Sequence, residues 1–432
     1  MSHSTIVVAL AVLLGLVLPA RSARAHGDWG HVHVTGWAIE NLPPGELRSF
    51  FSDPEVFNAA LFGAAFPDSG YWGETPASRE YGEHSHWEPF VEDAIELLRS
   101  ERPPLFWTRE DRKLVAFLMG CAAHGLQDEI FDSLFLFQVE ENDGGGQDEA
   151  DPGTDFFLID DGLFRFVPRE YVPMDVLLRL YAGLPQTITE DVVRAGVDVQ
   201  TRTYINDGIA LVIARSLVDE FRAILPWSQH HYLDPAIPGS LVAEIEPTKR
   251  HIEALWDRLH GRFTDRDLVV HAYPERGRLL RSGSATTVDS WITLVFGKAP
   301  RVETVTGSLR DATGNVVPFE LVGTRWGHPF PRLVRFQPRA DLVPGGRYTV
   351  TLDAGAELID GSVTTEPATV SFRVACAEGD ASCPRGTPRV PLLDGSARRE
   401  GGSCRRLSAN GAGDLFASAA GACTPRSLAS RR

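Results

Sequence analysis

The chain has 432 residues, of which 43% are hydrophobic and 23% are charged, a composition typical of a globular protein with two or three domains. Its formal net charge of −16 argues against a general binder of nucleic acids or anionic membranes, because no basic field would attract phosphates. An acidic protein that acts on phosphate esters would need the local charge of bound metal ions instead.

The N-terminal segment is predicted to be a signal peptide covering residues 1–25. Its apolar run, residues 6–18, is too short to span a bilayer comfortably, and the cleavage signature Ala23-Arg24-Ala25 follows. The preceding MSHST lacks Lys and Arg, which departs from the usual pattern. No later segment is apolar enough to span a membrane, so we expect a secreted or periplasmic bacterial protein whose mature chain begins at His26.

Residues 26–263 are predicted to form an all-helical domain, because apolar residues recur there at helical spacing. The clearest helices are expected at residues 32–41, 87–99, 111–137, 174–182, 209–225 and 248–259.

The helix expected at residues 111–137 carries a polar stripe. His124, Asp128 and Asp132 stand at positions i, i+4 and i+8, which share one face of a helix. Burying this set is costly unless a cation neutralises it, and His and Asp are common metal ligands. The helix alone leaves two interpretations open, a metal site and a solvent-facing stripe. Cys121, on the same helix, is predicted to be a small buried hydrophobe.

Other polar clusters lie within the first 155 residues. Singly, each fits an ordinary structural role, but together they favour a metal site. They are His26, His31 and His33 at the expected mature N-terminus, Asp68 after a proline, His84 and His86 ahead of a helix, and Asp151 with Asp155 at i, i+4.

Residues 265–375 are predicted to form a β-sandwich of about a hundred residues. β-rich runs at 290–296, 332–336 and 347–352 are separated by turn signals, and they resemble bacterial immunoglobulin-like modules, which serve as spacers or adhesive units. Trp326 and His328 are expected in an ordinary loop of this module, with a contact point as the alternative. Residues 376–432 are predicted to be a loosely ordered tail in which disulfides form among Cys376, Cys383, Cys404 and Cys423.

Four motifs, in their order and spacing, resemble the zinc-dependent phospholipase C family, which includes the fungal single-strand-specific nucleases and the glycosylphosphatidylinositol-specific phospholipase D type. The motifs are His31 with Ala38 and Leu42, then residues 63–68, 85–90 and 113–128. The resemblance continues into residues 171–178 and covers residues 26–185.

This resemblance implies an all-helical domain that holds up to three zinc ions. His31, Asp68, His86, His124 and Asp128 match family metal ligands. The family also binds metal through the amino group and carbonyl of its first mature residue, which would be His26. Asp68 matches a carboxylate that bridges two metals, and it is the candidate general base.

Two positions depart from the family pattern. Asp132 and Asp151 stand where relatives have histidines, while Asp155 keeps the acidic character of its position. More oxygen ligands would weaken the preference for zinc and favour Mn²⁺, Mg²⁺ or Ca²⁺ at one or more positions. His33 and His84 are candidates to compensate. The acidic residues 140–151 are expected to form a solvated loop, with a flap that carries an extra cation site as the alternative.

The expected reaction is hydrolysis of a phosphoric ester. Clustered divalent ions lower the pKa of a bound water and neutralise charge on the phosphate, and Asp68 would orient or deprotonate that water. The expected substrate is a phospholipid or another phosphodiester, with transient contact to a membrane surface and no stable nucleic-acid partner. Two alternatives remain, a nuclease of the same architecture and a non-catalytic adhesion protein with a degenerate metal site.

Overall fold

The computed structural model describes residues 27–213, 215–377, 383 and 389–390. The predicted signal peptide, His26, Cys404 and Cys423 therefore lie outside the described residues. The chain divides into two units, Met1–Leu392 and Leu393–Arg432, and the second lies wholly outside the described residues. In the described part, no helix is long and apolar enough to cross a membrane.

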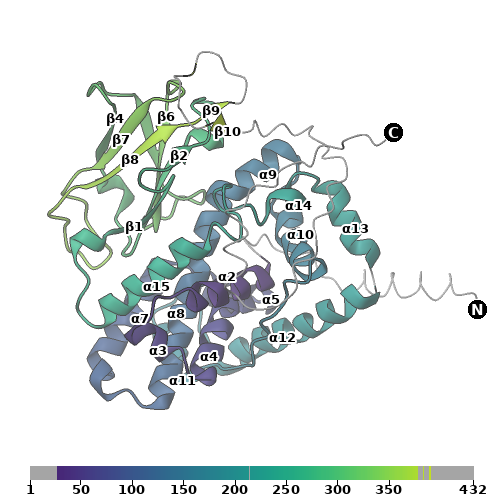
Figure 1. The fold of residues 1–432 in the computed structure, drawn as a ribbon. Helices are drawn as coiled ribbons and strands as arrows, with labels where there is room; N and C mark the ends of the chain where they lie inside the picture. Colours follow the sequence, from purple (N-terminus) through teal and green to yellow (C-terminus); the bar gives the residue numbers. More distant parts are fainter. Residues whose placement is uncertain (1–26, 214, 378–382, 384–388, 391–432) are drawn as a thin grey trace, which may run out of the picture. The chain divides into compact units, whose positions relative to one another are not determined.

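The first part of the chain is helical (Figure 1). In chain order the helices are α2 (Asp28–Glu40), α3 (Glu46–Phe50), α4 (Pro54–Ala65), α5 (Ser69–Trp72), α6 (Pro76–His86), α7 (Glu88–Glu101), α8 (Arg109–Ile130), α9 (Leu136–Asn142), α10 (Gln147–Asp160), α11 (Met174–Leu180), α12 (Glu190–Ile213), α13 (Arg215–Ile224), α14 (Ser228–His231) and α15 (Ile245–Leu259). Two short turns matter for the site, the 3₁₀ turn η1 (Phe66–Asp68) and the π-helical turn η3 (Phe131–Phe135).

Two predictions within this region differ from the structure. Within the expected helix at residues 209–225, residues 209–213 and 215–224 are helical as predicted, but α12 already begins at Glu190, because Val193, Val197 and Gln200 bury one face at helical spacing. The acidic residues 140–151 do not form a long loop, since α9 extends to Asn142 and α10 begins at Gln147. The Glu149 carboxylate accepts a hydrogen bond of 2.8 Å from the backbone N–H of Gly146, which fixes the start of α10.

Helices α4 and α8 cross at two glycines. A Cβ atom at Gly120 would lie 2.1 Å from the carbonyl oxygen of Ala60, and one at Gly63 would lie 2.0 Å from that of Phe117. Only hydrogen fits at these positions, so the two backbones approach more closely than side chains would allow. The crossing places the end of α4 beside the middle of α8, where the polar stripe begins.

The last part of the described chain contains two four-stranded sheets, ordered β1-β3-β6-β5 and β2-β8-β7-β4. The strands are β1 (Val269–Tyr273), β2 (Leu279–Leu280), β3 (Ile292–Phe296), β4 (Gly307–Asp311), β5 (Phe319–Val322), β6 (Leu333–Pro338), β7 (Arg347–Leu352) and β8 (Ala368–Val374). All neighbouring strands are antiparallel except β2 and β8, which are parallel. The predicted strand runs correspond to β3, β6 and β7.

The two sheets share a hydrophobic cluster. Phe296 and Phe336 contribute from the first sheet, and Leu309, Val350 and Phe372 from the second. The immunoglobulin-like topology stays a prediction. After β8, the short strands β9 (Cys376–Ala377) and β10 (Arg389–Val390) pair, and a disulfide joins Cys376 to Cys383.

The strands are also joined to the helices by apolar contacts. A second cluster combines Leu126, Ile130 and Leu134 of α8 and η3 with Val295 and Leu333 of the first sheet. Helix α15 packs along β1 in the same region (Figure 1). The end of α8, which carries the polar stripe, is therefore fixed from both sides.

Candidate metal centre

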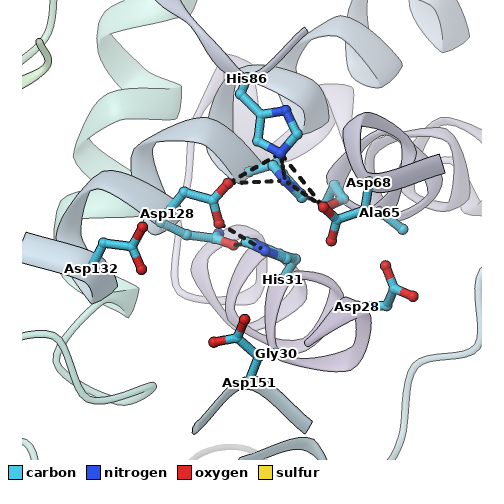
Figure 2. Close-up of polar contacts among 12 residues, drawn as sticks. Asp28, Gly30, His31, Ala65, Asp68, His86, Asp128, Asp132 and Asp151 are labelled. Atoms are coloured by element: carbon cyan, nitrogen blue, oxygen red, sulfur yellow. Dashed lines mark hydrogen bonds and ion pairs between the residues drawn. The ribbon is translucent and has the colours of Figure 1, made fainter. Parts of the chain in front are cut away.

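Five polar side chains from four separate elements converge in the helical region (Figure 2). His31 comes from α2, Asp68 from η1, His86 from the end of α6, and His124 and Asp128 from α8. All five are buried, and none is more than 4% exposed. In the described part of the chain they form two groups whose donor atoms lie within 4.8 Å of one another, His31 with His124 and Asp128, and Asp68 with His86 and His124.

Asp128 lies at the centre of this cluster. Its Oδ1 is 3.1 Å from Nε2 of His31, and its Oδ2 is 3.3 Å from Nε2 of His86 and 3.2 Å from Nε2 of His124. Asp68 Oδ1 lies 3.5 Å from Nε2 of His86 and 3.9 Å from Nε2 of His124. Three imidazole nitrogens and two carboxylates therefore face a common point.

Two of the histidines are oriented by backbone carbonyls. Nδ1 of His86 lies 2.6 Å from the carbonyl oxygen of Gly82, and Nδ1 of His124 lies 2.6 Å from that of Ala64. A carbonyl oxygen only accepts, so each Nδ1 carries the proton and each neutral ring keeps its lone pair on Nε2. These two Nε2 atoms are 3.0 Å apart. Two lone pairs at this distance repel unless a proton or a metal ion lies between them.

The third histidine is held by a side chain. Nδ1 of His31 is 2.9 Å from Oε1 of Gln127, whose Nε2 donates to Oγ1 of Thr35 at 2.9 Å. The second bond fixes the amide so that its oxygen faces His31. The outer contact of each histidine is thus an acceptor, the arrangement typical of metal-binding imidazoles.

The charges of the cluster shift its pKa values. Burial lowers the pKa of His31, but the carboxylate of Asp128 outweighs burial and raises this pKa to about 9. Burial also opposes charge on His86, and Asp68 and Asp128 raise its pKa. Burial lowers the pKa of His124, and the charge of His31 lowers it further. Without a metal ion, the cluster therefore retains protons near neutral pH.

Two further acidic side chains surround the cluster without joining either group. Burial raises the pKa of Asp132 to about 8, and the charge of Asp128 adds to this shift; burial and the charge of Asp132 raise the pKa of Asp151 well above its usual range. Oδ1 of Asp132 and Oδ1 of Asp151 are buried and have no hydrogen-bond partner among the described residues. In Figure 2 the carboxylate of Asp151 points toward the cluster. Such oxygens are costly to bury unless they bind a proton or a cation.

Asp155 has a different environment. Its Oδ2 accepts from the backbone N–H of Trp29 at 3.1 Å, and its Oδ1 accepts from that of Gly30 at 2.8 Å. Both groups belong to the first turn of α2, where negative charge is favourable. Asp155 therefore anchors the helix that carries His31.

The suggestion that His33 compensates for a lost ligand is wrong. Its Nδ1 donates to the carbonyl of Trp29 at 2.8 Å, and its Nε2 accepts from the backbone N–H groups of Arg165 and Phe166. Burial lowers its pKa to about 4, so the ring is neutral and both nitrogens are used. The ring of His84 packs against core aromatic rings rather than against the cluster.

Two residues near the site, Glu244 and Asp28, were not among the predicted site residues, and Trp326 was expected in an ordinary loop, with a contact point as the alternative. Glu244, before α15, is fully buried; burial and the charges of Asp128 and Asp132 raise its pKa well above the usual range. Asp28 accepts from Nε1 of Trp72 at 3.2 Å, and Trp326 donates a hydrogen bond to Asp132. Asp28 was visible in the N-terminal motif, whereas Glu244 lies in a segment without any sequence signal.

Comparison with known proteins shows a distant, partial homology. Over 195 residues the chain is 32% identical to phosphatidylinositol-glycan-specific phospholipase D of Mus musculus, covering 42% of this chain and 23% of that protein. The protein of the same name from Bos taurus is 33% identical over 190 residues, which cover 40% of this chain and 22% of that protein. The one from Homo sapiens is 32% identical over 180 residues, which cover 38% of this chain and 21% of that protein. The chain spans less than a quarter of these relatives. No protein-family model matches it.

Similar solved structures include the alpha-toxin of Clostridium perfringens, at 12% identity and a TM-score of 0.24, covering 81% of this chain and 99% of the toxin. CopC from Methylosinus trichosporium OB3b matches at 20% identity and a TM-score of 0.20, covering 25% of this chain and 91% of CopC. Scores this low carry no structural argument.

Proposed function

We propose that this protein is a metal-dependent phosphoric ester hydrolase of the phospholipase type, which uses an activated water to attack a phosphodiester. The contact between Nε2 of His86 and Nε2 of His124 carries the proposal, because both Nδ1 atoms face carbonyl oxygens and the two facing lone pairs need a proton or a metal ion between them. The partial homology to phospholipase D supports the same reaction class.

Five buried side chains would bind the cations, and one of them would also act on the attacking water. His31, Asp68, His86, His124 and Asp128 would hold the cations, which when bound supply Lewis-acid activation of water and neutralise charge on the phosphate. Asp68 lies beside two of the histidines, and its carboxylate would orient the attacking water and accept its proton. Because Asp68 is only 1% exposed, bulk water competes little for this contact.

The outer carboxylates would favour different ions from the histidines. His31, His86 and His124 suit Zn²⁺, whereas Asp132 and Asp151 offer only oxygen and suit Mn²⁺, Mg²⁺ or Ca²⁺. His26 would complete the site from the mature N-terminus, and Asp155 would act through α2. The disulfide between Cys376 and Cys383 supports the proposed export of the chain, since disulfides persist in oxidising compartments.

An activity screen tests this function. The purified mature protein would be incubated with phosphatidylinositol vesicles, phosphatidylcholine vesicles, a glycosylphosphatidylinositol-anchored protein and bis-p-nitrophenyl phosphate. We expect hydrolysis of at least one of them, its loss on chelation, and its recovery when Zn²⁺ or Mn²⁺ is restored. Single-stranded DNA in a parallel reaction tests the nuclease alternative.

A matched pair of variants serves as the control. Asp128→Asn should abolish hydrolysis, whereas Asp198→Asn, at an exposed position of α12, should leave it unchanged. If the fully metal-loaded protein cleaves none of these phosphodiesters, the hydrolase proposal is wrong and a non-catalytic metal-binding protein remains.

A further inference from the structure

The loop between β5 and β6 reaches the candidate metal centre from the sheet region. It is anchored at Arg325, whose guanidinium donates to both carboxylate oxygens of Glu140 at 3.1 and 2.6 Å. The backbone N–H of Arg325 donates to Oγ of Ser133 at 3.2 Å, and the guanidinium of Arg335 donates to the carbonyl of Ser133 at 3.0 Å. Ser133 follows Asp132 in the π-helical turn η3.

The far end of this loop is fixed behind the cluster. Arg332 is fully buried, pairs with Glu129 at 3.1 Å and donates to the carbonyl of Ala122 at 2.8 Å. It also donates to the backbone carbonyl of His86. His328 stacks on Trp87, the residue after His86, with ring centroids 3.5 Å apart. The loop is therefore held at one end by Arg325 and at the other by Arg332.

Trp326 stands at the middle of the loop and contacts a candidate ligand directly. Its indole N–H donates a hydrogen bond to Oδ2 of Asp132. Trp326 is 50% exposed, whereas Asp132 is 1% exposed. The indole of Trp326 is therefore not part of the hydrophobic core. An indole N–H can only donate, so it takes one oxygen of the carboxylate and leaves Oδ1, which has no hydrogen-bond partner among the described residues.

The backbone at Asp132 explains why such support is needed. The α-helical register of α8 ends at Ile130, and the π-helical turn that follows carries Asp132. A π turn shifts the side chains after it, and such turns are frequent at functional sites. Asp132 therefore lies beyond the last residue of α8, and its carboxylate is held by a hydrogen bond from outside that helix.

We propose that Trp326 is a positioning residue of the metal centre. Its indole N–H holds Oδ2 of Asp132 and presents Oδ1 to a divalent cation, so the sheet region supplies part of the site. This inference rests on the proposed function in so far as Asp132 binds a cation, but it does not require that the cation supports hydrolysis.

The test is a double-mutant cycle in cation affinity. Mn²⁺ and Co²⁺ would be titrated into the metal-free full-length protein as wild type, Trp326→Phe, Asp132→Asn and the double variant. We expect Trp326→Phe to weaken the ion held by Asp132 by about 10–100-fold and to change the visible spectrum of bound Co²⁺. In the Asp132→Asn background the same substitution should have almost no further effect.

Two further variants exclude a general effect of losing an indole. Trp291→Phe makes the same change in the same region, where the ring contacts Phe137 and no hydrogen bond to a candidate ligand occurs in the described structure; it should bind ions like wild type. Trp326→His keeps a ring N–H and should recover part of the affinity. The thermal unfolding midpoint of Trp326→Phe should match that of wild type, because Trp326 is half exposed.

The outcomes separate this inference from the proposed function. If wild type binds cations but hydrolyses no phosphodiester, the proposed function fails and the affinity cycle still decides the role of Trp326. Wild-type affinity in Trp326→Phe, equal losses in both backgrounds, or wild-type binding in Asp132→Asn would each overturn the inference. A wild-type protein that binds no divalent ion would overturn both proposals.

Discussion

The orientation of the three histidine rings in the cluster is set by the hydrogen-bond acceptors that their Nδ1 atoms contact. The carbonyls of Gly82 and Ala64 hold His86 and His124, and Gln127 holds His31, so each Nε2 faces the two carboxylates. Asp128 contacts all three rings, whereas Asp68 contacts two of them. At the scale of single residues the site is prepared for cations before any cation binds.

Protons and metal ions should compete for the side chains of this site. Asp128 raises the pKa of His31 against burial to about 9, and burial raises that of Asp132 to about 8, so the metal-free protein holds both protons at pH 7. A cation must displace them. We expect affinity for Zn²⁺ to rise by about tenfold per pH unit for each displaced proton and to level off above pH 9. Titration calorimetry in two buffers of different ionisation enthalpy counts the released protons; affinity that is constant between pH 6 and 9 would contradict this.

The sequence predicts residues better than it predicts their surroundings. His124 and Asp128 follow from helical spacing, and Asp68 and His86 from short motifs, and all four meet in space. The partner of Trp326 and the placement of Glu244 near Asp128 could not be found this way, because both depend on segments more than a hundred residues apart.

At the scale of elements, the crossing of α4 and α8 sets the geometry of the cluster. The close backbone approach at Gly63 and Gly120 brings the carbonyl of Ala64 to Nδ1 of His124. The same approach brings η1, which directly follows α4 and carries Asp68, next to α8.

We expect Gly120→Ala to disturb both stability and the site. The added Cβ would lie 2.1 Å from the carbonyl oxygen of Ala60, so the helices must separate, at a cost of about 1–3 kcal/mol of unfolding free energy. Zn²⁺ affinity should fall with it, because His124 loses its carbonyl contact. Gly183→Ala is the control, since nothing lies within 4 Å of its added Cβ. Urea unfolding and a Zn²⁺ titration check both effects, and wild-type values for Gly120→Ala would refute this role of the crossing.

Element boundaries show where local patterns stop being sufficient. The long helix expected at residues 111–137 is present, but the π-helical turn Phe131–Phe135 interrupts it, and Asp132 lies in that turn. Helix α10 was missed because Pro152 and the acidic residues suggest a loop, whereas the cap at Gly146 begins a helix that buries Asp151.

At the scale of the whole molecule, a buried ionic network joins the sheets to the helices. Arg332, before β6, pairs with Glu129 of α8 at 3.1 Å, and Arg258 of α15 pairs with Glu88 of α7 at 2.7 Å. Oε2 of Glu88 also lies 3.8 Å from Nε of Arg332, so the two ion pairs form one network. Breaking one member of such a network leaves a buried charge without its partner.

Arg332→Met should therefore destabilise the protein by about 3–5 kcal/mol. Burial already raises the pKa of Glu129 to about 7 against the attraction of Arg332, and removing the cation raises it further. The ionised carboxylate is then more costly to bury, so the loss should be larger at pH 8.5 than at pH 6. Urea unfolding at both pH values measures it, with Arg339→Met, in an exposed pair with Glu320, as a control that should change little. An equally small effect of Arg332→Met would contradict the structural role of this network.

The most direct measurement is the metal content of the purified mature protein, determined by elemental mass spectrometry. We expect about two tightly bound divalent ions per chain, their loss in Asp128→Asn, and their retention in Asp198→Asn. Less than one ion per chain in wild type, unchanged in Asp128→Asn and after reconstitution with Zn²⁺ and Mn²⁺, would contradict a metal centre and the hydrolysis that depends on it.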